Sequence, residues 1–177
     1  LDAYLDKTRI PLKIDISTGD VITPCEISFS YQLMFENRTI PLLAYPPETV
    51  LAEKLETILS RGEANTRLRD FYDVYILQRE DFVVTPDALC HALLATCRKR
   101  GHEDLLHTYA SILDRVRQSG TMRTQWMKYQ SDFDYAAGIT WDTVLDTVET
   151  LCMKTLDDHA FGDELPQEES QFEMHLL

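Results

Sequence analysis

Hydrophobic and polar positions alternate along the first 45 residues. Apolar side chains occupy every second position over residues 10–17 and again over residues 27–35, a period typical of half-buried β-strands. Asn37-Arg38 predicts a turn into a third strand over residues 39–45, so this part should form a hairpin. Pro46-Pro47 then ends the predicted strand region.

After Pro47 the apolar positions recur every three to four residues, which is the period of an amphipathic helix. The pattern predicts six helices, near residues 48–61, 66–79, 86–99, 102–118, 121–135 and 140–156. Glycine commonly follows the last residue of a helix, and we expect this role for Gly62, Gly101, Gly120 and Gly138. The fold class is therefore α+β, with strands over residues 1–45 and a helical bundle over 46–157 of the same domain.

Composition narrows the class of protein. The chain has 177 residues, of which 44% are hydrophobic, and this length and composition suit one globular domain. No uninterrupted apolar window is long enough for a membrane helix. The four cysteines lack metal-site spacing, and Cys90 and Cys97 fall at core positions of a predicted helix. We expect a cytoplasmic protein that does not span a membrane.

Charge is spread unevenly over the chain. The net charge is −13, and seven acids with no Lys or Arg lie between Asp157 and the C-terminus. We expect residues 158–177 to form an acidic, disordered tail. Nonspecific binding to duplex nucleic acid is disfavoured because it needs clustered cations, although a local cationic pocket is compatible with this composition.

Two predicted helices carry charges beside their apolar faces. At about 100° per residue, Lys54 and Arg61 lie at the edge of the apolar stripe of residues 51–59. Asp70 and Asp73 share one face of the next helix. The short connection predicts an αα-hairpin, and cations beside a packing face need acidic partners. We therefore expect Lys54 and Arg61 to face Asp70 and Asp73.

This spacing leaves two interpretations open. The first, which spacing alone favours, is a structural network of ion pairs between two helices. The second is a site in which the lysine and an arginine bind phosphate while the acids orient them.

Three runs of sequence carry a resemblance to a known family. They are KIDISTGDVITP at residues 13–24, YPPETVLAEKLETILSRG at 45–62 and NTRLRDFYDVYIL at 65–77. These runs, and the helical region from Trp126 to Val144, resemble the nucleotidyltransferase-like AbiEii/AbiGii toxins of abortive-infection (phage-defence) and toxin–antitoxin systems. The resemblance extends over nearly all of residues 5–150.

The resemblance implies a polymerase-β-like nucleotidyltransferase fold, of which residues 1–45 would be a remnant of the sheet. It also implies transfer of a nucleotide from an NTP to an acceptor, which is tRNA in some members. That transferase chemistry uses carboxylates that hold Mg²⁺ against the triphosphate. The expected partners are an NTP, tRNA and a cognate antitoxin.

Matching the family's motifs position by position implies the site residues. Asp15 corresponds to a carboxylate that binds the metal. Lys54 corresponds to a lysine near the nucleotide phosphates, and Asp70 belongs with these two in the catalytic set. The resemblance gives Arg61 and Arg69 nucleotide-binding roles, and an orienting or structural role to Glu53, Arg67 and Asp73.

One motif of the family is missing from the sequence. The family begins with a Gly-Ser or Gly-Gly turn followed by Asp-x-Asp, whereas the DxD of this chain is Asp132-Phe133-Asp134, in a late helical segment. We interpret these two acids as surface residues. Because the chain also starts at Leu1, we expect the C-terminal portion of a family member, inactive in nucleotide transfer by itself.

The alternative function is a non-catalytic protein-interaction module in the same type of system. Its helical part would bind a partner such as an antitoxin. Exposed strand edges would in addition favour a homodimer. The sequence does not specify the NTP, the acceptor or the oligomeric state.

Overall fold

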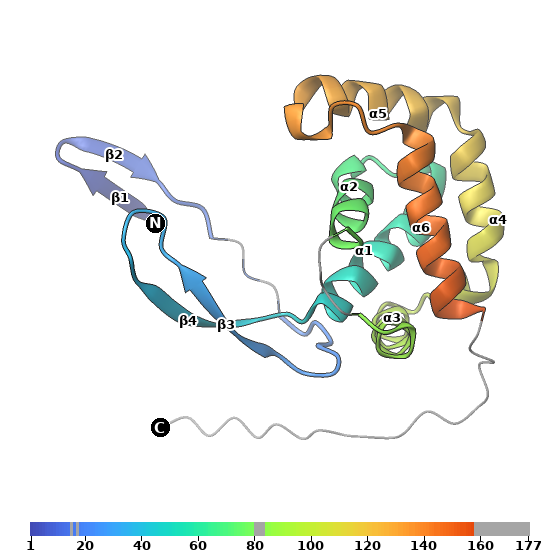
Figure 1. Ribbon diagram of the computed structural model, residues 1–177, viewed down its shortest axis with the longest axis horizontal. Helices are drawn as coiled ribbons and strands as arrows, with labels where there is room; N and C mark the ends of the chain where they lie inside the picture. The colour runs from blue at the N-terminus through green and yellow to red at the C-terminus, as the bar shows by residue number, and fades with distance from the viewer. Residues whose placement is uncertain (15, 17, 80–83, 158–177) are drawn as a thin grey trace.

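The computed structural model describes residues 1–14, 16, 18–79 and 84–157 of the 177-residue chain. Within these ranges the chain forms four strands in two hairpins, followed by six α-helices and two short 3-10 helices (Figure 1). This order confirms the predicted α+β class. The acidic tail at 158–177, for which we predict disorder, lies outside the described residues.

The strands form two separate antiparallel hairpins rather than one sheet. β1 (Asp2–Leu5) pairs with β2 (Thr8–Pro11), and β3 (Ile27–Gln32) pairs with β4 (Thr39–Ala44). The β3–β4 hairpin is the one that the alternation predicts. The predicted strand over residues 10–17 is too long: β2 ends at Pro11, and after the backbone hydrogen bonds between Leu12 and Leu1 the described residues 13, 14 and 16 belong to no strand.

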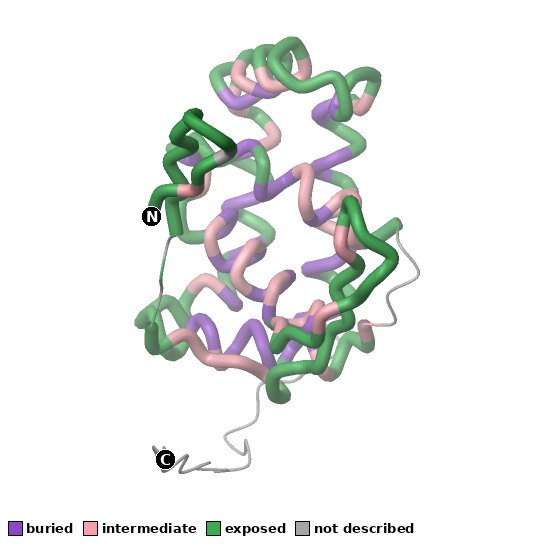
Figure 2. Tube along the Cα trace, turned by 90° about the vertical axis from the view of Figure 1, so that its left-hand side faces the viewer, coloured by how far each residue is buried: buried purple, intermediate pink, exposed green. Residues whose placement is uncertain are grey.

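Both hairpins are exposed, which corrects the expectation of half-buried strands. Ile27, Phe29 and Tyr31 lie on one face of β3 and are 39–50% exposed. The strand register places Ile40 and Leu42 beside Tyr31 and Phe29 on the same face. The hairpins extend away from the helices, and their traces are coloured mainly as exposed (Figures 1 and 2). No described element covers this apolar face, so the alternation does not produce burial.

All six predicted helices are confirmed to within a few residues at each end. They are α1 (Pro47–Arg61), α2 (Leu68–Leu77), α3 (Pro86–Arg100), α4 (Leu105–Gln118), α5 (Gly120–Asp132) and α6 (Trp141–Leu156), with 3-10 turns at η1 (Gly62–Ala64) and η2 (Asp134–Ala136). Gly62, Gly101 and Gly138 have positive φ, as expected for chain turns. Gly120 is different: it is the first residue of α5, and Ser119, whose side chain accepts a hydrogen bond from Met122 N, separates α4 from α5.

Helix α1 lies at the centre of the helical part. Its residues Leu51, Leu55 and Ile58 are fully buried, and it packs against α2, α3 and α4. Phe71 of α2 contacts Trp141 of α6 with ring centroids 5.1 Å apart. This arrangement gives α1 two charged sides, one toward α2 and one toward α3.

The fold bears on two expectations drawn from composition. Cys90 and Cys97 are buried in α3, as predicted. Among the described residues, no helix has the length and apolar character that crossing a membrane requires.

Candidate functional site

A tight connection brings α1 and α2 together. Gly62 has φ +50° at the end of α1, and η1 follows at once. Asn65 is fully buried, and its Oδ1 accepts a hydrogen bond from Arg67 N (2.7 Å) just before α2 begins. The predicted αα-hairpin therefore forms, with its charged residues facing across the two helices.

Lys54 is the centre of this charged cluster. Its Nζ lies 2.7 Å from Asp70 Oδ1 and 2.7 Å from Asp73 Oδ2. The three side chains are 22%, 2% and 28% exposed, respectively. Burial by itself lowers the pKa of Lys54, but its hydrogen bonds to Asp70 and Asp73 and their negative charges outweigh this effect and raise the pKa. Lys54 therefore stays charged and fixed in position.

Arg67 supplies a second cation to the buried carboxylate. Its Nε lies 3.1 Å from Asp70 Oδ2. The contact is not aligned as a hydrogen bond, so this buried oxygen has a charged neighbour but no hydrogen-bond donor among the described residues. Asp70 is thus held between Lys54 and Arg67.

The structure separates the remaining predicted residues from this cluster. Arg61 is exposed and forms no ion pair with described residues. Of the two cations expected to face Asp70 and Asp73, only Lys54 does so. Arg69 is exposed, forms no ion pair with described residues and lines a pocket. Glu53 points toward α3, 3.6 Å from Arg100 Nη2. Asp15, the expected metal ligand, lies outside the described residues.

A second charged cluster on α1 was not predicted. Glu56 is 2% exposed, and its carboxylate contacts Arg100 Nη1 and, at 2.6 Å, His102 Nδ1. Burial raises the pKa of the neighbouring Glu53, and the charge of Arg100 opposes this shift only in part. Helical spacing places Glu56 away from the predicted apolar stripe, so only the packing of α3 over α1 reveals that it is buried.

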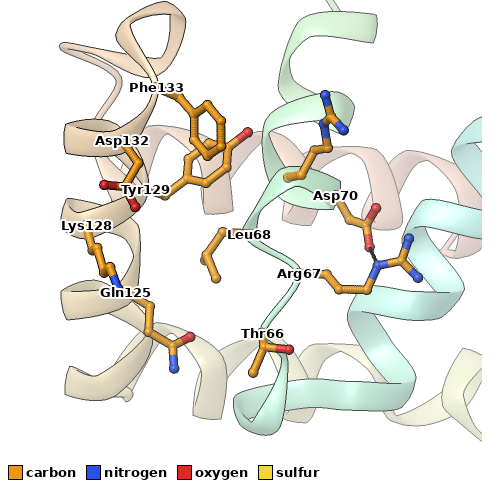
Figure 3. Close-up of a pocket in the computed structure, with 10 residues that line it drawn as sticks. Thr66, Arg67, Leu68, Asp70, Gln125, Lys128, Tyr129, Asp132 and Phe133 are labelled. Carbon is orange, nitrogen blue, oxygen red and sulfur yellow. Dashed lines mark ion pairs between the residues drawn. The ribbon is translucent and has the colours of Figure 1, made fainter. Parts of the chain in front are cut away.

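A pocket of about 410 Å³ opens between the start of α2 and helix α5 (Figure 3). Leu68 lies between the two walls, with Arg67 and Asp70 toward α1 and the rings of Tyr129 and Phe133 on the α5 side. The pocket is lined by Thr66, Arg67, Leu68, Arg69, Asp70, Gln125, Lys128, Tyr129, Asp132 and Phe133. It shares Asp70 and Arg67 with the Lys54 cluster, so the two features adjoin.

Sequence reasoning assigned no site role to the α5 wall of this pocket. Asp132 and Asp134 are exposed, as predicted for surface acids, yet Asp132 lines the pocket. The available signal was the pair of aromatic residues Tyr129 and Phe133, spaced one turn apart on a mainly polar helix beside Lys128. Such a pattern indicates an aromatic surface, but the element that faces it is not readable from spacing.

Carboxylates near Lys54 do not offer a metal site by themselves. Asp70 and Asp73 both face the Lys54 ammonium. Within the described ranges no group of three or more His, Cys, Asp or Glu residues is arranged to hold a metal ion.

Comparison with known proteins gives one result. The model of a family described as nucleotidyl transferase AbiEii toxin, of a type IV toxin–antitoxin system, matches residues 1–147. Searches of the curated proteins and of the solved structures gave no match.

Proposed function

Because this chain belongs to the AbiEii family of nucleotidyltransferase toxins, we propose that its α1–α2 hairpin forms the triphosphate-facing side of a nucleotide-transfer site. The observation that carries the proposal is the Lys54 ammonium, held 2.7 Å from both Asp70 and Asp73. An ammonium has three N–H donors, so one remains for a phosphate oxygen. Asp70 and Asp73 act as positioning residues that keep this donor charged and oriented.

The transfer chemistry places negative charge on the phosphates of the departing pyrophosphate. A fixed cation stabilises that charge without moving during the reaction. Lys54 supplies this cation, and Arg67 holds the second oxygen of Asp70 so that the carboxylate does not rotate away from Lys54. Glu53 has a structural role here, through its contact with Arg100.

The family's chemistry implies Mg²⁺, but the described residues alone do not fit this ion. The two carboxylates near Lys54, those of Asp70 and Asp73, are already paired with the Lys54 ammonium. We keep Asp15 as the proposed metal ligand on the basis of its motif, and we assign no step to the metal.

To test the Lys54 proposal, we compare two variants, each of which removes one cation that lies between two acidic side chains. Lys54→Met should weaken binding of an NTP about tenfold or more, because it removes a charged hydrogen bond. Arg117→Met is the matched control, since Arg117 bridges Asp146 and Glu149 at 2.8 and 2.6 Å on the α4–α6 side. Binding of a fluorescent ATP analogue is measured for both, together with thermal unfolding. Equal NTP binding by the wild-type protein and Lys54→Met would refute the proposal and leave the structural ion-pair network.

Nucleotide transfer by the chain alone is a separate question. The Gly-Ser turn and Asp-x-Asp of the family are absent from the sequence, so we propose that this chain binds NTP without transferring it. Incubation with Mg²⁺, labelled NTPs and bulk tRNA measures this directly. Incorporation of label into tRNA would contradict the proposal.

A non-catalytic interaction module is the second candidate function. The exposed apolar face of the β3–β4 hairpin favours it, because large exposed apolar patches mark interaction sites. In the first candidate, these strands belong to a polymerase-β-like sheet. In the second, they bind a partner protein such as a cognate antitoxin, and the Lys54→Met result discriminates between the two.

A further inference from the structure

The pocket between α2 and α5 has a size and lining that suit a small polar ligand. Its volume of about 410 Å³ lies within the usual range for ligand sites. No side chain caps the first turn of α2 at Arg67, which leaves backbone N–H groups of the helix start at this end of the pocket. The lining combines cations from α2 with aromatic side chains from α5.

Two cations on the pocket wall are available to a ligand. Arg69 and Lys128 are exposed, and neither forms an ion pair with a described residue. Arg67 is 54% exposed while it contacts Asp70. Of the two acids in the lining, Asp70 is neutralised by Lys54 and Arg67, which leaves Asp132 as the one acid without a cation among the described residues. The pocket is therefore locally cationic on a chain whose net charge is −13.

The aromatic wall is held rigidly. Tyr129 stacks on Trp126 with ring centroids 5.3 Å apart, and it contacts Phe133 at 4.8 Å. The Tyr129 hydroxyl is hydrogen-bonded to Tyr135 at 2.9 Å, and Phe133 stacks on Tyr135 at 5.4 Å. Phe133 is nevertheless 41% exposed. A large aromatic side chain that is fixed and still accessible offers a flat surface to a planar ligand.

We propose that this pocket binds one unpaired nucleotide unit. Its base stacks against Phe133 and Tyr129, and its phosphate contacts Arg69 and Lys128, the combination by which proteins bind single-stranded nucleic acid. The pocket shares Asp70 and Arg67 with the Lys54 cluster, so the bound nucleotide lies beside the triphosphate of the NTP, where an acceptor must lie. This placement rests on the proposed function.

The experiment uses the full chain and a fluorescein-labelled single-stranded oligoribonucleotide, with binding followed by anisotropy at constant salt. Arg69→Gln/Lys128→Gln and, separately, Phe133→Leu should each raise the Kd about tenfold. Lys99→Gln/Arg115→Gln is the matched control, because it removes two exposed cations away from the pocket. Circular dichroism verifies that each variant is folded. An unchanged Kd in both pocket variants, or an equal loss in the control, would overturn the proposal.

Two further measurements separate the sources of the ligand and the two proposals. If AMP displaces the labelled oligonucleotide from the wild-type protein but not from the pocket variants, the ligand of the pocket is a free mononucleotide. If only unlabelled single strands displace it, and neither AMP nor a duplex does, the ligand is one nucleotide of a strand. Lys54→Met should retain oligonucleotide binding. NTP binding by Lys54→Met tests the proposed function, and oligonucleotide binding by the pocket variants tests the proposed pocket. Each proposal can therefore be refuted without the other.

Discussion

Asp70 and Asp73 contact the same ammonium but differ in burial, and this difference predicts unequal effects of their substitution. Asp70 is 2% exposed and lies between Lys54 and Arg67, whereas Asp73 is 28% exposed. Removing one partner of a buried ion pair is strongly destabilising, whereas a partly exposed pair contributes little. Asp70→Asn should lower the free energy of unfolding by about 2 kcal/mol, and Asp73→Asn by less than about 1 kcal/mol. Urea unfolding at pH 7 measures both, and equal losses would contradict the assigned burial.

A buried thiol predicts how stability depends on alkaline pH. Burial raises the pKa of Cys152 from 9.0 to about 12, so the thiol stays protonated in the folded chain and ionises in the unfolded chain. Its contribution to stability is therefore complete below pH 9 and is lost as the pH rises toward 12. At pH 10 the loss is about 1.4 kcal/mol for this one group.

Urea unfolding of the wild-type protein and Cys152→Ala at pH 7 and pH 10 measures this loss. The variant should be less stable at pH 7 because it creates a cavity, yet it should lose less stability between the two pH values. Cys25→Ala, at an exposed position, should retain the wild-type pH dependence. A pH dependence of Cys152→Ala equal to that of the wild-type protein would show that Cys152 does not cause the loss.

The charged cluster shows how far residue-level prediction reaches. The helical angles of Lys54, Asp70 and Asp73 were sufficient to predict their contact, because both helices and the short connection between them are local in sequence. Arg61 has a similar angle but forms no ion pair with these acids. Helical angle gives the direction of a side chain and not its height along the helix, and Lys54 already contacts both acids.

At the scale of elements, two glycines that follow helices predict opposite effects of the same substitution. Gly62, which follows α1 and begins η1, has φ +50°, where an added Cβ would be strained. Gly120 begins α5 and has no atom within 4 Å of an added Cβ. Gly62→Ala should destabilise by about 1–3 kcal/mol, and Gly120→Ala should be neutral or stabilise by up to about 1 kcal/mol. Thermal unfolding distinguishes them. Destabilisation by Gly120→Ala of the same size as that by Gly62→Ala would indicate that neither effect comes from φ.

Helices were predictable from the sequence and strands only in part, for a physical reason. Each helix satisfies its backbone hydrogen bonds within one segment, so the period of Leu51, Leu55 and Ile58 specifies its own structure. A strand needs a partner that its own sequence does not identify. Alternation over residues 10–17 therefore predicts too long a strand, because it does not show that pairing with the first segment ends at the Leu1–Leu12 backbone hydrogen bonds.

For the whole molecule, the exposed hairpins predict self-association. The β3–β4 hairpin presents Ile27, Phe29 and Tyr31 on one face, and two-stranded sheets have unpaired edges on both sides. We predict concentration-dependent association of the chain, measured by sedimentation velocity. Phe29→Lys should weaken it, whereas Ser30→Lys, on the opposite face of the same strand, should leave it largely unchanged. A monomer at all concentrations would contradict the prediction.

The pocket is a property of the whole molecule that no local pattern contains. Arg69 and Phe133 are distant in sequence, and they share a pocket because α5 packs against α2, where the rings of Tyr129 and Tyr72 lie 6.4 Å apart. Periodicity predicts both helices and leaves their relative placement open. The resemblance to a family includes residues of α5, but it gave site roles only to Asp15 and to residues of the α1–α2 hairpin.

Glu56 has a consequence for how sequences of this kind can diverge. Its buried carboxylate is held by Arg100 and His102, which follow it by more than forty positions. Glu56 is 2% exposed, whereas Arg100 and His102 are 35% and 45% exposed. Loss of Arg100 therefore removes the cation that neutralises a buried carboxylate, and a sequence with that single change should be disfavoured by selection. In an alignment of related sequences, positions 56 and 100 should therefore change together, and a relative without a cation at position 100 should have an uncharged residue at position 56.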